Sequence, residues 1–326
     1  MGIDISKATL DAALIIKEGE VVGQTKVANN SHGFNDLASW IRKLKVKLSD
    51  VLVCAEHTGI YGYDLQIWLD DMQISFAFVP ALEIKRSLGI RRGKNDAVDA
   101  LRIAEYAYIR RESISLSHKP SDVIFQLRAL LGERKQYVRM RAALLARKDA
   151  LHQYESKESI DRREKIIDKY AEYIASVDKQ MRGLMEHDDE IKRNYELISS
   201  VKCIGLVNAI NTLVYPNNFT SFQTPRQYAC YCGIAPFEHT SGTSIKGRTA
   251  VSKMGNQQLK CELTMAARSA IIHDPWMKQY YKRKMMSKGN APGAHGIVLN
   301  AIKFKLIVRM FSVVKSGIPY KVMAYC

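Results

Sequence analysis

The sequence predicts a chain that is α/β at its start and mainly α-helical afterwards. Three observations lead to this prediction. Short apolar runs alternate with helical patterns over the first hundred residues, a long stretch without proline then carries heptad repeats, and the positive charge is concentrated near the end. With 326 residues, of which 47% are hydrophobic, the chain can bury the cores of two or three domains. We expect these domains at residues 1–118, 119–195 and 196–326.

The first strands form a predicted antiparallel meander. Residues 2–5, 9–16 and 21–27 are rich in apolar and β-branched side chains, and the polar residues 17–20 are typical of a turn. Because the connections between these strands are short, each strand is expected to pair with the one before it.

Helices and strands then alternate. A helix follows a cap at Asn30 or Ser31, a second helix is expected at residues 63–72, and residues 51–55 and 74–79 are short apolar strands. The apolar face of the first helix consists of Phe34, Leu37, Ile41 and Leu44. This alternation predicts that the later strands are added to the meander in parallel, with helices on both faces of the sheet.

Four acidic residues are candidate metal ligands. Asp96 and Asp99 lie three residues apart at the start of a predicted helix, Glu56 ends a buried strand, and Asp4 lies between two isoleucines of the first strand. For the aspartate pair alone, a solvated first helical turn is the alternative explanation. Carboxylates from three separate elements favour a Mg²⁺ site, because oxygen ligands suit this ion and such clusters support phosphoryl transfer.

These four positions resemble the DEDD tetrad of the RuvC-like nuclease domains, which have the RNase H fold. The resemblance covers about residues 1–110 and implies an RNase H/RuvC-like first domain. An actin-like sugar kinase is the other protein class that the Gly-Ile-Asp start allows, but no glycine-rich second phosphate segment follows it.

A long helical segment is predicted next, because no proline occurs between Ser121 and Tyr215. Apolar residues recur every seven positions on both sides of a polar break at residues 154–159. The repeats are Leu130, Tyr137, Leu144 and Leu151, and then Ile160, Ile167, Ile174 and Met181. The pattern predicts a helical hairpin or coiled-coil arm, which serves in oligomerisation or RNA contact, or only as a spacer.

The net charge of +16 lies almost entirely in the last part of the chain. Residues 191–326 contain 19 lysines and arginines against four acids, whereas the rest of the chain has a net charge of only +1. Such a distribution is typical of a domain that binds a polyanion, and it indicates nucleic acid as the partner.

The six cysteines do not form the paired C-x-x-C spacing of a zinc site, so we expect reduced thiols. No run of apolar residues is long enough to span a membrane, and no signal segment follows Met1. A cytoplasmic protein is therefore expected.

Residues 225–262 combine serines, glycines and cations, and a helix is expected to open near Asn256. Backbone N–H groups and cations of this kind bind phosphate. Ser241 and Ser244 are both candidate nucleophiles, and their chemistry alone does not distinguish them. Further upstream, residues 200–206 are similar in sequence to a phosphate-binding helical hairpin, with Cys203 in the place of the first glycine. A plain helix-turn-helix is the alternative.

The C-terminal motifs resemble those of a transposase family. They are Gly233-Ile234-Ala235-Pro236, Ser241-Gly242, Gly247 and Ser252-Lys253-x-Gly255. Together with the tetrad, they make the chain similar, over nearly its whole length, to the DEDD transposases related to the Piv invertase, the insertion-sequence family numbered one hundred and ten.

This resemblance implies a DNA recombinase. Ser241 matches the serine that attacks DNA phosphate and forms a phosphoserine, while Asp4, Glu56, Asp96 and Asp99 match the Mg²⁺ ligands. The resemblance also implies donor and target DNA and a non-coding guide (bridge) RNA as partners. A dimer that assembles into a tetramer on nucleic acid is expected, associated with the nucleoid when active. Charge and adjacency alone suggest Lys246, Arg248 and Lys253 as phosphate contacts.

Two other functions remain compatible with the sequence. A RuvC-like, metal-dependent junction resolvase or nuclease would use the tetrad and only hold phosphate with Ser241. A non-catalytic nucleic-acid-binding scaffold would need neither the metal nor the serine.

Overall fold

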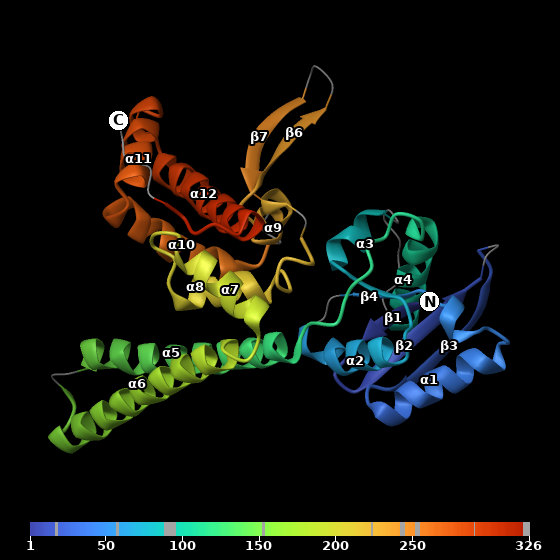
Figure 1. The fold of residues 1–326 in the computed structure, drawn as a ribbon. Helices are drawn as coiled ribbons and strands as arrows, with labels where there is room; N and C mark the ends of the chain where they lie inside the picture. The colour runs from blue at the N-terminus through green and yellow to red at the C-terminus, as the bar shows by residue number, and fades with distance from the viewer. Residues whose placement is uncertain are drawn as a thin grey trace. The chain divides into compact units, whose positions relative to one another are not determined.

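A computed structural model of the chain shows two compact units, Met1–Lys119 and Pro120–Cys326 (Figure 1). The structure describes residues 1–16, 19–56, 59–87, 96–151, 154–222, 224–241, 245–251, 255–289 and 291–321. Mixed α/β structure in the first unit and mostly helical structure in the second confirm the expected fold class at this level.

The first unit is built on a five-stranded sheet with the order β3-β2-β1-β4-β5. The strands are β1 (Gly2–Ile5), β2 (Thr9–Ile15), β3 (Val21–Ala28), β4 (Val53–Glu56) and β5 (Phe76–Val79). The first three strands pair antiparallel, and β4 and β5 are added in parallel next to β1, so both pairing predictions are confirmed.

Helices cover both faces of this sheet. They are α1 (Ser31–Lys43), α2 (Tyr63–Asp71), α3 (Ala81–Ser87) and α4 (Asp96–Arg110), with short 3₁₀ turns η1 (Leu48–Asp50) and η2 (Gly59–Gly62). The Asn30 side chain accepts the N–H of Gly33 at 3.0 Å and thereby caps α1, as the sequence predicts. Ile3 and Ile5 pack with α1 and α2, whereas Cys54 and Ala77 pack with α4 on the opposite face.

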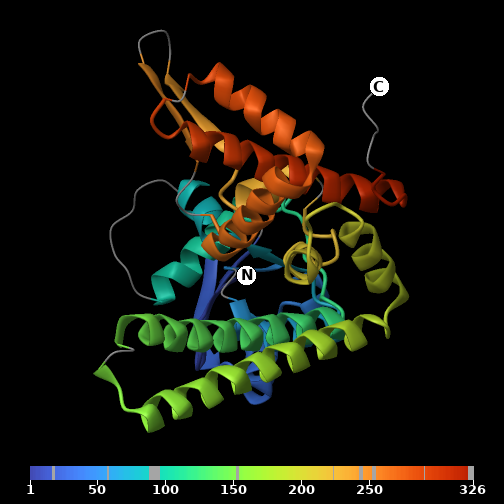
Figure 2. The same cartoon turned by 90° about the vertical axis from the view of Figure 1, so that its left-hand side faces the viewer.

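The second unit begins with two long helices, α5 (Asp122–Leu151) and α6 (Lys157–Met185), which lie side by side in Figures 1 and 2. The ring of Tyr137 in α5 lies 6.0 Å from that of Tyr170 and 5.4 Å from that of Tyr173 in α6. Arg134 and Asp178 form an ion pair of 2.6 Å between the same helices. The predicted long helices are therefore present and contact each other.

Helices also form most of the remaining chain. They are α7 (Asp189–Ser199), α8 (Leu206–Val214), α9 (Pro225–Tyr231), α10 (Gln257–His273), α11 (Pro275–Ser287) and α12 (Ala294–Ser316). The core of this part lies around α12, whose Ile302, Leu306 and Met310 are fully buried. Between α7 and α8, Cys203 has a φ of 70°, a left-handed conformation that favours glycine and suits its place in the hairpin motif.

A two-stranded antiparallel hairpin, β6 (Pro236–Ser241) and β7 (Ile245–Val251), interrupts the helices. The serines and glycines of this segment did not predict strands. Figure 1 shows the hairpin extending away from the neighbouring helices of its unit.

None of the described helices combines the length and the hydropathy that crossing a lipid bilayer would require.

Candidate active site

The alternation of side chains along β1 and β4 places two predicted ligands on the same face of the sheet. Gly2 lies against α4 so closely that a β carbon there would be 2.1 Å from the backbone nitrogen of Ala104. Asp4 is two residues further along β1 and therefore faces the same helix. The parallel register pairs Gly2 with Cys54, which places Glu56 at the corresponding step beside Asp4.

The start of α4 brings the other two predicted ligands to this face. Asp96 and Asp99 lie in its first turn, and their charges act on Asp4. Burial, as the largest cause, and then the carboxylates of Asp96, Asp99, Glu56 and Asp11 together raise the pKa of Asp4 to about 6. The structure therefore brings the four predicted acids into one electrostatic cluster.

A fifth acid, Asp11, belongs to the same cluster and was missed by the sequence analysis. It pairs directly with Asp4 across β1 and β2, so the two side chains share a face. Asp11 is buried, and its Oδ2 lies 2.9 Å from Nζ of Lys26. The signal in the sequence was an aspartate within an apolar strand, which resembles the signal that identified Asp4.

Basic side chains surround the acids. Lys26 Nζ also lies 3.8 Å from Oδ2 of Asp96, and Arg102 donates to Oδ1 of Asp99 at 3.0 Å. Burial raises the pKa of Glu56, Lys85 opposes this shift, and Asp99 adds to it. These cations offset part of the repulsion among the carboxylates.

The chemistry of this donor set fits a hard divalent cation. The carboxylates supply only oxygen ligands, which Mg²⁺ prefers, and a bound cation would relieve the repulsion that raises the pKa of Asp4. Among the described residues, no three His, Cys, Asp or Glu side chains are close enough to chelate an ion as they stand. Lys26 and Arg102 hold Asp96 and Asp99 instead.

The predicted nucleophile belongs to the second unit. Ser241 is the last residue of β6 and pairs with Ile245, the first residue of β7. The base of the hairpin is tightly packed, because a β carbon on Gly255 would lie 2.2 Å from Cα of Gly233. The Asn300 side chain of α12 donates to the Ile234 carbonyl at 2.6 Å and fixes the segment that leads into β6.

The other predicted residues of this region lie on or next to the hairpin. Lys246 and Arg248 are part of β7, where Lys246 pairs with Thr240. Ser244 and Lys253 lie outside the described residues. The choice between Ser241 and Ser244 therefore stays a prediction, as do the phosphate contacts of the three cations.

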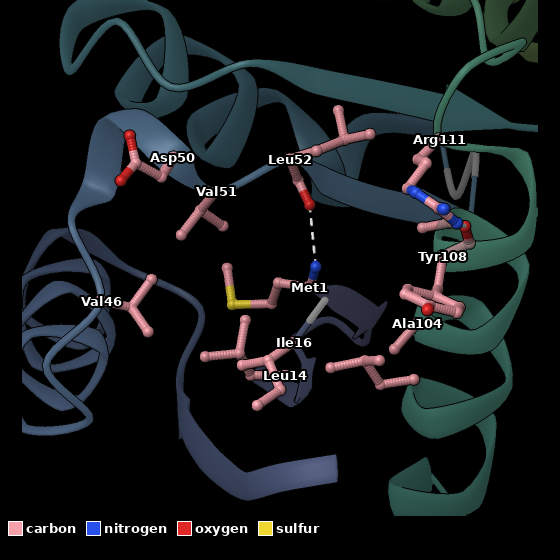
Figure 3. A pocket seen from close by; sticks show the side chains of 12 residues that line it. Met1, Leu14, Ile16, Val46, Asp50, Val51, Leu52, Ala104, Tyr108 and Arg111 are labelled. Atoms are coloured by element: carbon pink, nitrogen blue, oxygen red, sulfur yellow. Dashed lines mark hydrogen bonds between the residues drawn. The ribbon is translucent and has the colours of Figure 1, made fainter. Parts of the chain in front are cut away.

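An apolar pocket of about 330 Å³ lies elsewhere in the first unit (Figure 3). Met1, Leu14, Val51 and Ala104 line it, and Tyr108 and Arg111 of α4 border it. None of the predicted catalytic residues lines this pocket. Its apolar lining makes it unsuitable as the site of the carboxylate chemistry.

Two family models match the chain. A model of IS110-type DEDD transposases, described as "Transposase", matches residues 1–154. A second model, described as "Transposase IS116/IS110/IS902 family", matches residues 195–282. The first match includes the acid cluster, and the second includes the hairpin that carries Ser241.

Curated relatives extend the similarity over nearly the whole chain. The pilin gene-inverting protein of Moraxella bovis is 28% identical over 323 residues, which cover 98% of this chain and 97% of that protein. The protein of the same name from Moraxella lacunata shows the same identity and coverage. An insertion element IS110 uncharacterized 43.6 kDa protein of Streptomyces coelicolor is 28% identical over 159 residues, or 48% of this chain and 38% of that protein.

Proposed function

This chain belongs to the IS110 family of transposases, and we propose that it cuts and rejoins DNA by a Mg²⁺-assisted serine mechanism. The observation that carries the proposal is the convergence of Asp4, Glu56, Asp96 and Asp99, from two strands and one helix, on one face of the sheet. The strand order, with two parallel strands beside an antiparallel meander, supports an RNase H/RuvC-like first domain.

In this proposal the four acids hold Mg²⁺, and Asp11 with Lys26 supports them from the neighbouring strands. An ion held by these acids would supply positive charge at the scissile phosphate and so would favour attack on phosphorus. The raised pKa of Asp4 fits this role, because a carboxylate among other carboxylates is ready to exchange its proton for a cation.

Ser241 provides the nucleophile. Its Oγ forms a bond to phosphorus and loses its proton, while the bond between phosphorus and the 3′ oxygen breaks and that oxygen takes up a proton. The products are a phosphoserine and a free 3′ hydroxyl. In the rejoining step the 3′ hydroxyl of another strand attacks the phosphoserine and releases Ser241. Lys246, Arg248 and Lys253 contribute positive charge at the phosphate.

The partners follow from the same family assignment. We propose donor and target DNA as substrates, and a bridge RNA whose base pairing selects them. If the chain has the three predicted domains at residues 1–118, 119–195 and 196–326, the tetrad and Ser241 belong to different domains. A dimer that assembles into a tetramer would let one subunit supply the acids and another the serine. The protein would act in the cytoplasm, on nucleoid DNA.

A covalent adduct tests the nucleophile. Wild-type protein incubated with Mg²⁺ and a DNA substrate should form a protein–DNA species that survives denaturation, with the phosphate on Ser241 by mass spectrometry. Ser241→Ala should abolish the adduct, and Ser39→Ala, at an exposed position of α1 in the first unit, should retain it. DNA cutting by Ser241→Ala at the wild-type rate would eliminate the nucleophile assignment.

A second function, a metal-dependent nuclease or junction resolvase, is favoured by the acid cluster if Ser241 only holds phosphate. The two functions differ in their products, because hydrolysis leaves a free 5′ phosphate and no adduct. Asp96→Asn should abolish both reactions, since the metal is common to them. Full recombination by a folded Asp96→Asn protein would remove the metal role of this residue.

A further inference from the structure

Two stacked aromatic rings on α11 organise a group of basic side chains. The rings of Trp276 and Tyr280 lie 5.6 Å apart with an interplanar angle of 4°. Lys305 of the neighbouring helix α12 places its Nζ 4.8 Å from the Trp276 centroid and 4.7 Å from the Tyr280 centroid. A lysine that covers two ring faces is held in place by cation–π attraction from both.

Three more cations surround the same rings. Arg309 of α12 lies 5.0 Å from the Trp276 centroid, and Arg283 and Lys284 of α11 lie 5.8 Å and 6.0 Å from the Tyr280 centroid. We call this group the α11–α12 basic face, which consists of Trp276, Tyr280, Arg283, Lys284, Lys305 and Arg309.

The positive charge of this face is mostly unbalanced. Asp274 is buried and is already committed to Arg309 at 2.6 Å and to the N–H groups at the start of α11. Within the part of the chain that the structure describes, no carboxylate pairs with Arg283, Lys284 or Lys305. The face therefore presents about three positive charges without acidic partners.

The cations of this face repel one another. Burial lowers the pKa of Lys305, and Arg309, Arg283 and Lys284 lower it further. The rings orient the cations but do not neutralise them, because an aromatic ring carries no net charge. A bound anion that contacts several of these groups would remove their mutual repulsion.

We propose that the α11–α12 basic face binds the phosphodiester backbone of the DNA substrate without reading its sequence. This inference rests on the proposed DNA recombinase function and adds a second DNA contact to the one proposed at the hairpin. A polyanion fits better than a small anion because the cations are spread over two helices. The ring faces of Trp276 and Tyr280 are covered by cations, so they are not free to stack on bases.

The spacing along α11 supplies a matched control. Tyr280 lies four residues after Trp276, and Arg283 and Lys284 lie three and four residues after Tyr280, so these side chains share one face of the helix. The exposed Lys278 and Lys282 lie on another face. Arg283→Gln/Lys284→Gln and Lys278→Gln/Lys282→Gln each remove two charges from exposed positions of the same helix.

The test measures binding of the full-length protein to duplex DNA of random sequence by fluorescence anisotropy over a range of salt concentrations. Arg283→Gln/Lys284→Gln should weaken binding about tenfold at about 100 mM salt and reduce the slope of log K against log salt by about 2. The control variant should retain most of the wild-type slope, and circular dichroism should show both variants folded.

Two outcomes would overturn the proposal. Equal effects of the two double variants would mean that only the overall charge matters. If the double variant at Arg283 and Lys284 binds RNA more weakly but binds duplex DNA as the wild type does, the face is assigned to RNA instead. The Ser241–DNA adduct of the wild-type protein is measured in parallel. If Arg283→Gln/Lys284→Gln reduces the slope but the wild-type protein forms no adduct, the nucleophile assignment is contradicted and the proposal for the basic face still holds.

Discussion

Asp4 shows how one residue can carry the chemistry of a site. Its position in a strand between two buried isoleucines would ordinarily call for an apolar side chain. Burial and, after it, four neighbouring carboxylates raise its pKa to about 6, so the folded protein without metal binds a proton there more tightly than the unfolded chain does. The contribution of the Asp4 proton to the stability of the metal-free protein is therefore lost as the pH rises from about 4 through about 6.

A bound divalent cation should reverse this pH dependence. We predict that Mg²⁺ raises the melting temperature clearly at about pH 7.5 and much less at about pH 5, because protons then occupy Asp4. Asp4→Asn should melt higher than wild type at the higher pH without Mg²⁺ and should gain nothing from Mg²⁺. Differential scanning fluorimetry measures both effects. Asp70→Asn, at an exposed position of α2, should behave as wild type, and equal Mg²⁺ stabilisation of Asp4→Asn would exclude Asp4 as a ligand.

At the scale of elements, close backbone contacts position both candidate catalytic groups. Gly2 allows α4 to lie directly on β1, which brings Asp96 and Asp99 toward Asp4. Gly255 and Gly233 touch backbone to backbone at the base of the β6–β7 hairpin. The glycines of the sequence motifs thus have a packing role, since any side chain there would separate the elements that they join.

We predict that Gly255→Ala destabilises the second unit by about 1–3 kcal/mol, because the new methyl group would lie 2.2 Å from Cα of Gly233. Urea unfolding followed by circular dichroism measures the change. Gly132→Ala is the matched control within α5, where nothing lies within 4 Å of an added β carbon, and it should stabilise by about 0.5–1 kcal/mol. Equal stability of Gly255→Ala and wild type would contradict the packing role.

At the scale of the whole molecule, the two parts of the chain differ in net charge. Residues 191–326 carry a net charge of +15, while residues 1–190 are nearly neutral. The acid cluster lies in the nearly neutral part, and both the β6–β7 hairpin and the α11–α12 basic face lie in the basic part. This division fits the proposed recombinase, in which the C-terminal part would bind nucleic acid and the N-terminal part would bind metal.

We predict that a structured RNA encoded beside the gene co-purifies with the full-length protein and is recovered by sequencing. Adding this RNA and target DNA should convert the dimer into a tetramer in light scattering coupled to size-exclusion chromatography. A random sample of cellular RNA in the purified protein would argue against RNA guidance. A mass that does not change on adding both nucleic acids would contradict the assembly.

The sequence by itself determined the local elements and the main catalytic candidates. Alternating apolar patterns predicted the meander, helical spacing predicted α1, and the acids at Asp4, Glu56, Asp96 and Asp99 were visible as charges in apolar or capping positions. These features depend on residues close together in the chain, whose periodicity reports directly which face is buried.

Only the tertiary structure decided which distant residues meet. The cross-strand pairing of Asp4 with Asp11, the strands of the β6–β7 hairpin, and the position of Lys305 over Trp276 depend on register and on the packing of separate elements. A one-residue shift in register would turn Asp11 away from Asp4, and local patterns contain no measure of that shift. The acid cluster and the basic face are therefore products of packing between elements, from residue types that the sequence had placed far apart.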